Sequence, residues 1–237
     1  MVDILAFGVH PDDIELGAGG TLIKHVKKGF KVGLVDLTQG ELGTRGTVET
    51  RKVESENAAH IIGADFRVNL NMEDAFVSTN KDNIIKIVQL VRLYKPKIVI
   101  CNAIKDRHPD HGEASKLVVK SCFNAGLSKL STQYNSGEQK AHRPDSIYHY
   151  IQDQWIDPSL VVDVSDVYDE KIKAVMAYKT QFYNPKSTEP STPISSKEFL
   201  DSLNAKAQLW GRSIKTKYGE GFTLENPVGI NSLFDIF

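Results

Sequence analysis

The chain has 237 residues, 41% of them hydrophobic, and its 29 basic and 30 acidic side chains give a formal net charge of −1. That length suffices for one large buried core, and no long linker rich in Pro, Gly or Ser divides it, so we expect a single domain over residues 1–237. The balanced charge argues against nucleic acid as a partner and leaves electrostatic recognition to local groups.

The N-terminal segment and the cysteines bear on where the protein works. Segment 1–13 has no basic region before its apolar run and reaches a proline and two aspartates early. This pattern signals neither export nor membrane anchoring. Cys101 and Cys122 fall in an expected strand and an expected helix, which favours buried free thiols over a disulfide. We therefore expect a cytoplasmic protein without a membrane partner.

Apolar runs typical of strands alternate with helical periodicity through the first half of the chain. The run at 3–9 predicts a buried strand because it leaves little room for a solvated face. A helix follows and ends before the glycine at position 29, a residue type common just after helix ends. The pattern then predicts, in chain order, a strand at 31–37, a helix at 48–62, a strand at 66–70, a helix at 81–94, a strand at 97–102 and a helix at 113–125.

The second half is less regular but continues the alternation. It predicts strands at 147–151 and 160–164 and helices at 167–182 and 197–217. Between those helices, residues 184–196 are rich in Pro, Ser and Thr and predict a loop long enough to act as a flap over a site. Alternating strands and helices of these lengths predict an α/β fold, with a Rossmann-like, mainly parallel sheet covered by helices on both faces.

Two short motifs carry the chemical signal: His-Pro-Asp-Asp at 10–13 and His-Pro-Asp-His at 108–111. Each comes shortly after a predicted core strand. In doubly wound sheets ligands bind beyond the carboxyl ends of the strands, where the strand order reverses, so we expect the two distant motifs to face each other. Either motif alone is weak, since such an aspartate often caps the next helix and such a proline only sets a turn. The pair is the specific signal.

Together the motifs offer three imidazoles and three carboxylates, more than the three protein ligands of a catalytic zinc ion that keeps one position for water. The surplus suits acid–base catalysis. Because Asp12 and Asp13 are adjacent, their side chains do not easily point the same way, so we expect one carboxylate on the metal and the other beside the bound water. The same division applies to His108 and His111. The residue types alone leave open which member of each pair binds the ion.

Other segments carry weaker signals. Residues 17–20, Gly-Ala-Gly-Gly, lack the pattern of a phosphate loop and predict close packing of the first helix on the sheet. The glycine-punctuated loop at 38–46 is expected to line the pocket. Arg51 is a candidate for substrate binding, with Arg107 and Arg143 as weaker candidates. The remaining histidines are expected to be structural: His25, His60, His142 and His149.

Several stretches of the sequence resemble the LmbE-like, or PIG-L, family of metal-dependent N-deacetylases over nearly the full length. They are AFGVHPDDIELGAGGTL, DLTQGELGTRGT with ETR after it, DRHPDHGEA, and AYKTQF followed later by GEGF. The chain is most similar to the branch of that family that acts in bacillithiol biosynthesis. The resemblance implies the LmbE-like form of the α/β fold predicted above.

By that resemblance three residues would hold a zinc ion, or another divalent ion such as Fe²⁺: His10, Asp13 and His111. Asp12 would be the general base, and His108 would stabilise the oxyanion in its protonated form or act as acid. Asp110 would orient His108. Arg51 matches a family arginine that contacts the substrate.

The activity that the resemblance implies is hydrolysis of N-acetylglucosaminyl malate to glucosaminyl malate and acetate. Other N-acetylglucosamine derivatives and thiol-conjugate amides are alternative substrates, and the family implies a homo-oligomer, a trimer or a hexamer. Two rival classes stay open. One is an iron oxygenase that holds its metal by two histidines and one carboxylate, and the other is a noncatalytic sugar- or metal-binding protein on the same fold. The full set of acid–base groups favours the hydrolase over both.

Overall fold

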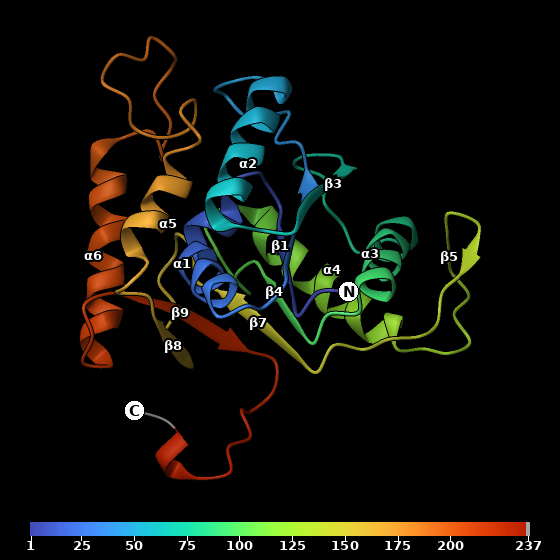
Figure 1. Cartoon of the computed structure of the whole chain (residues 1–237). Coiled ribbons are helices and arrows are strands. Elements are labelled where there is room, and N and C mark those ends of the chain that lie inside the picture. Colours follow the sequence, from blue (N-terminus) through green and yellow to red (C-terminus); the bar gives the residue numbers. More distant parts are fainter. Residues whose placement is uncertain (236–237) are drawn as a thin grey trace.

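The central sheet forms where apolar residues leave no position for a solvated face. β1 (Ile4–Gly8) and β2 (Val32–Thr38) are buried at every position, as expected of parallel strands covered on both sides. The computed structural model describes residues 1–235 and places both strands in a seven-stranded sheet (Figure 1). The other strands of this sheet are β3 (Phe66–Met72), β4 (Ile98–Cys101), β7 (Ser146–Tyr150), β8 (Leu160–Asp163) and β9 (Gly219–Leu224).

The order of the strands, β3-β2-β1-β4-β7-β9-β8, decides where a site can form. The chain runs from β1 outward to β2 and β3 and then returns to β4, which pairs with β1. The order therefore reverses between β1 and β4, and in such sheets the carboxyl ends of the strands at the reversal border a crevice. The pairs among β1, β2, β3, β4 and β7 are parallel, whereas β9 is antiparallel to β7 and β8.

Helices cover both faces of the sheet (Figure 1). They are α1 (Asp13–Lys27), α2 (Val48–Ile62), α3 (Lys81–Tyr94), α4 (Pro109–Ala125), α5 (Tyr168–Val175) and α6 (Lys197–Ser213). Successive residues of a strand point to opposite faces. Leu5 and Phe7 of β1 accordingly pack with α3 and α4, while Ile4 and Ala6 pack with the other four helices. Within residues 1–235, no helix is long and apolar enough to span a membrane.

The predicted α/β fold class is confirmed, and so is the type of every element predicted in the first half of the chain. α4 begins at Pro109, earlier than predicted, because the His108 side chain caps it and proline suits the first turn of a helix. The glycines of α1 pack closely as predicted, since a Cβ on Gly17 would lie 2.1 Å from Cδ2 of Tyr150. Both cysteines are free and buried.

The predicted helix at 167–182 is wrong in its length, because α5 ends at Val175. In the residues that follow, Thr180 and Gln181 form hydrogen bonds to other parts of the fold. The main-chain N–H and the hydroxyl of Thr180 donate to the Glu54 carboxylate, and Nε2 of Gln181 donates to the carbonyl of Arg45. These contacts tie the segment after α5 to α2 and to the predicted pocket loop.

Three features of the second half depart from the prediction: local left-handed turns end α6 and form a hairpin, and tertiary pairing forms a strand. α6 ends at Ser213 rather than at 217. The glycine-rich strand β9 was not predicted, and it forms between β7 and β8. A short hairpin was also not predicted, and its strands are β5 (Gln133–Tyr134) and β6 (Gly137–Glu138).

Candidate functional site

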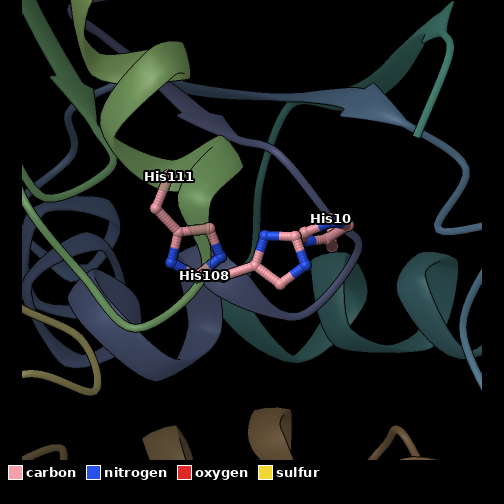
Figure 2. A group of neighbouring side chains, drawn as sticks. All are labelled: His10, His108 and His111. Atoms are coloured by element: carbon pink, nitrogen blue, oxygen red, sulfur yellow. The ribbon is translucent and has the colours of Figure 1, made fainter. Parts of the chain in front are cut away.

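The two motifs meet at the reversal point of the sheet, as predicted. Motif 10–13 follows β1, and motif 108–111 forms the start of α4 after β4. Figure 2 shows the imidazoles of His10, His108 and His111 converging on one place. One nitrogen of each ring lies within 4.8 Å of one nitrogen of the other two, a grouping that can hold a metal ion.

A strained turn separates the two aspartates of the first motif. Asp12 has φ 126°, a conformation that L-residues rarely adopt and that costs about 1–3 kcal/mol. Arg51 supports this turn, because its Nη2 donates to the carbonyl of Pro11 at 2.6 Å and to Oδ2 of Asp12 at 3.2 Å. The Asp12 carboxylate therefore faces Arg51, while the Asp13 carboxylate faces the histidines.

Asp13 lies between two of the three histidines. Its Oδ2 is 3.6 Å from Nδ1 of His10, and its Oδ1 is 3.3 Å from Nε2 of His111. The main-chain N–H of His10 also donates to Oδ2 at 3.0 Å. The side chains of Asp13 and His111 are almost fully buried, so these contacts are shielded from solvent.

His10 and His111 each have a second ring nitrogen that points away from Asp13. Another carboxylate binds this nitrogen in both residues. Nε2 of His10 is 3.0 Å from Oδ1 of Asp74, and Nδ1 of His111 is 2.7 Å from Oδ2 of Asp106. A carboxylate behind a histidine fixes the orientation of the ring and is typical of metal-binding histidines. The sequence analysis missed both aspartates, although Asp106 lies in the DRHPDH stretch and Asp74 follows β3 at the same edge of the sheet.

His108 has a different environment. No hydrogen bond joins its ring to a carboxylate in the part of the chain that the structure describes; its Nδ1 instead accepts from the main-chain N–H of Asp110 at 3.4 Å. The sequence analysis expected Asp110 to orient His108, and the contact with its ring is made by the backbone of Asp110, not by the carboxylate. That carboxylate lies near His10 and Asp74, and its Oδ2 is buried without a hydrogen-bond partner among residues 1–235.

The electrostatic field at the site favours a positive charge. Burial lowers the pKa of His10, but Asp13 and Asp74 outweigh this effect and raise it to about 9. Burial also lowers the pKa of His111, and there Asp13 and Asp106 raise it to about 10. Burial alone would raise the pKa of Asp13, yet the two facing histidines hold it well below its usual range.

The pKa values of two neighbouring groups, Asp12 and His108, are shifted toward the neutral form. Burial raises the pKa of Asp12 to about 7, although Arg51 opposes this shift. Burial lowers the pKa of His108, and the nearby His10 and His111 lower it further. The site thus contains a carboxyl group whose pKa is raised to about 7 and an imidazole whose pKa is lowered below its usual value.

The donor set fits a divalent cation. Two imidazoles and one carboxylate are the ligands of many catalytic zinc and iron sites. Both ring nitrogens that face Asp13 are acceptors when the opposite nitrogens donate to Asp74 and Asp106. A cation at this point would also supply the positive charge that the surrounding carboxylates favour.

The site lines a cavity of about 290 Å³. Leu42 and Gly43 of the predicted pocket loop and Ile194 of the predicted flap contribute to its wall, so both segments lie where the sequence analysis expected them. The buried side chain of Arg45 connects them, since it contacts Ser187 and Glu189 of the flap. The main-chain N–H of Gly46 also donates to Glu189 at 2.9 Å.

The three predicted substrate-binding arginines have separate positions. Arg51 lines the cavity and is buried, and Arg107 lies at its exposed rim, paired with Asp153. Arg143 lies outside the cavity lining, at the opposite end of α4. Its Nη2 donates to the carbonyl of Phe123, and its guanidinium stacks over the ring of that residue.

The four histidines predicted to be structural lie outside the cavity lining. Nδ1 of His25 bonds to the carbonyl of Thr21, and Nε2 of His142 bonds to the carbonyl of Pro96. His149 is fully buried on β7, and His60 is exposed on α2.

An α/β sheet with a candidate metal centre at its reversal point is found in several groups of proteins, and comparison of the sequence specifies one. The profile of the PIG-L family, described as GlcNAc-PI de-N-acetylase, matches residues 5–122. A conserved protein of Thermus thermophilus has 33% sequence identity and a TM-score of 0.86, over 97% of each chain. The chain belongs to the PIG-L, or LmbE-like, family.

Named relatives differ in their reactions. Diacetylchitobiose deacetylase of Thermococcus kodakarensis is 29% identical over 189 residues, which are 76% of this chain and 70% of that enzyme. The 4-oxalmesaconate hydratase of Pseudomonas putida is 24% identical over 195 residues, 75% of this chain and 73% of the hydratase. A hydratase is not among the functions predicted from the sequence.

Proposed function

We propose that the protein is a metal-dependent hydrolase that removes the N-acetyl group from an aminosugar of the N-acetylglucosamine type. The observation that carries this proposal is the position of Asp13 between two histidines, each bound from behind by a carboxylate. A second carboxylate, Asp12, lies beside this group and is not needed to hold the ion.

In this proposal His10, Asp13 and His111 hold the cation, Zn²⁺ or Fe²⁺. We leave His108 out of the ligand set because, among residues 1–235, no carboxylate binds its ring and its Nδ1 accepts from the main-chain N–H of Asp110. When bound, such an ion polarises an amide carbonyl and lowers the pKa of a water molecule to about 7. The remaining chemistry belongs to the side chains of this chain.

Asp12 accepts the proton of the attacking water. Its pKa of about 7 suits a general base, because such a group is ionised at neutral pH and still holds a proton well once it has taken it. Arg51 binds Oδ2 of Asp12 and orients the carboxylate. The proton that Asp12 receives is then available to the departing amine.

His108 stabilises the developing oxyanion as a neutral donor. Its Nδ1 accepts from the main-chain N–H of Asp110, so the ring proton is on Nε2. This proposal differs from the expectation of a protonated His108: burial and the nearby His10 and His111 lower the pKa of this imidazole. A well-placed donor of this kind contributes about 2.7–4 kcal/mol to stabilisation of the transition state.

The more specific substrate in the proposal is N-acetylglucosaminyl malate, in bacillithiol biosynthesis. Support comes from the resemblance of the DLTQGELGTRGT and DRHPDHGEA stretches to that branch of the family. The cavity of about 290 Å³ is at the small end of typical small-molecule sites and fits one sugar ring with a small aglycone near its rim. The family resemblance also leads us to propose a trimer or hexamer in the cytoplasm.

The experiment that tests the function is measurement of acetate release with zinc-loaded and chelator-treated protein. Three substrates are compared: N-acetylglucosaminyl malate, free N-acetylglucosamine and diacetylchitobiose. We expect metal-dependent release that is fastest with the malate glycoside. Equal release from all three would keep the deacetylase and remove the bacillithiol role.

The hydratase is the second candidate, because one relative of similar coverage carries that name. It also needs a positioned water and a base, so the site alone does not distinguish the two reactions. Absence of acetate release together with hydration of an unsaturated dicarboxylate would favour the hydratase. Sugar binding without either reaction would favour the noncatalytic binding protein.

A further inference from the structure

Two side-chain amides hold the carboxylate of Asp13, one on each oxygen. Nδ2 of Asn102 donates to Oδ2 at 3.0 Å, and Nε2 of Gln152 donates to Oδ1 at 2.7 Å. Asn102 comes directly after β4, and Gln152 comes two residues after β7. Both residues are buried. We call Asn102 and Gln152 the amide pair.

We propose that the amide pair positions the Asp13 carboxylate for the cation, an inference that rests on the proposed function. Amide N–H groups donate hydrogen bonds without carrying charge. They fix the carboxylate while leaving its negative charge for a metal ion, whereas a lysine or arginine in the same place would neutralise it. Carboxylates accept hydrogen bonds from the second ring nitrogens of the two histidines, and amides donate hydrogen bonds to the aspartate. Each proposed ligand is therefore oriented by a hydrogen-bond partner of the complementary kind.

Asn102 also connects Asp13 to the backbone of the first motif. Its Oδ1 accepts from the main-chain N–H of Val9 at 3.1 Å, directly before His10. Its own carbonyl lies 3.0 Å from Nδ1 of His149, and a carbonyl can only accept, so that nitrogen donates. Asn102 thereby fixes the Asp13 side chain relative to the end of β1, and His149 of the neighbouring strand β7 supports Asn102.

Gln152 provides the cleaner test, because its side chain makes one hydrogen bond in the described part of the chain. Donation to a carboxylate fixes the amide orientation, and this leaves Oε1 buried without a partner. An unpaired buried acceptor is unfavourable for folding. A residue retained only for stability would not need this amide, so its one hydrogen bond, to Asp13, points to a role at the site.

The decisive variant is Gln152→Met, which keeps the length of the side chain and removes the donor. We expect the dissociation constant of Zn²⁺, measured by competition with a chromophoric chelator, to rise by about 10–100-fold. The melting temperature of the metal-free variant should change little, because removal of the unpaired oxygen offsets the loss of the hydrogen bond to Asp13. A purely structural role would give the reverse: a lower melting temperature and unchanged zinc affinity.

Gln181→Met is the matched control. Gln181 is a buried amide of the same cavity, but it donates to the carbonyl of Arg45 and has no hydrogen bond to Asp13. Its replacement should leave the dissociation constant of Zn²⁺ unchanged. Equal weakening in both variants would mean a general loss of packing and would overturn the inference.

Asn102→Ala tests the other oxygen of Asp13, at a temperature where circular dichroism shows the metal-free protein to be folded. We expect weaker zinc binding, and in the double variant with Gln152→Met the two factors should multiply. Affinity within twofold of wild type in Gln152→Met would overturn the role of the amide pair and leave the proposed function standing. A wild-type protein that binds no divalent ion would overturn the metal site and the amide pair together.

Discussion

The two halves of the chain contribute to the same cavity in different ways. In residues 1–125 the candidate ligands and the base come from two short motifs at the ends of parallel strands, and the family profile matches 5–122. In residues 126–235 the contributing groups are single side chains from irregular segments: Gln152, Gln181 and Ile194. Local motifs thus supply the reacting groups. Side chains brought in by tertiary contacts line the cavity and hold the candidate ligands in place.

The largest expected effect distinguishes the proposed roles of the two histidines of the second motif, His108 and His111. His111→Ala should lose both metal and turnover, since it removes a proposed ligand. His108→Ala should retain metal, while kcat falls by about 10²–10³-fold because one oxyanion donor is lost. Metal content by mass spectrometry and acetate release measure the two effects. Metal loss in His108→Ala with retention in His111→Ala would mean that the two histidines have been exchanged.

A smaller effect tests the division between the adjacent aspartates. Asp12→Asn keeps an oxygen for the hydrogen bond from Arg51 and should bind metal normally, because Asp12 is not a proposed ligand. Its kcat should fall by about 10²–10⁴-fold, as expected for loss of a general base. Asp201→Asn, an exposed change on α6, is the control. Near-normal turnover of Asp12→Asn would exclude Asp12 as the base.

The smallest effect concerns the second half of the chain. Glu189→Ala removes the partly exposed contacts of Glu189 with Arg45 and Gly46 and keeps the contact of Arg45 with Ser187. KM should rise about two- to fivefold, in line with the strength of such contacts, and metal content should not change. Glu113→Gln, exposed on α4, is the control. A change in metal content in Glu189→Ala would show that the flap does more than shape the wall.

The fold and both motifs could be predicted from the sequence because they depend on local patterns. Apolar runs without a polar face predict buried strands, and the position of each motif after a strand predicts where it lies in a parallel sheet. The structure brings His10, Asp13 and His111 together at that point. The second half was predicted less well, since α5 stops where tertiary hydrogen bonds of Thr180 and Gln181 replace those of a helix.

The outer groups of the site could not be predicted, for a related reason. Asp74, Asp106, Asn102 and Gln152 are single polar residues in loops, and their partners are set by strand pairing and not by sequence neighbours. Arg143 was predicted to bind substrate but does not line the cavity. No local signal shows which end of α4 an arginine reaches, and this one stacks on Phe123, away from the cavity.

The pairing of β1 with β4 has a thermodynamic consequence for the proposed metal site. His10 and Asp13 follow one strand and His111 follows the other, so an unfolded chain does not hold the three ligands together. An ion that binds only the native state adds to its stability, by about 2.7 kcal/mol when its free concentration is a hundred times the dissociation constant. On this assignment, the supply of metal in the cell sets the fraction of chains that stay folded as well as the rate at which they work.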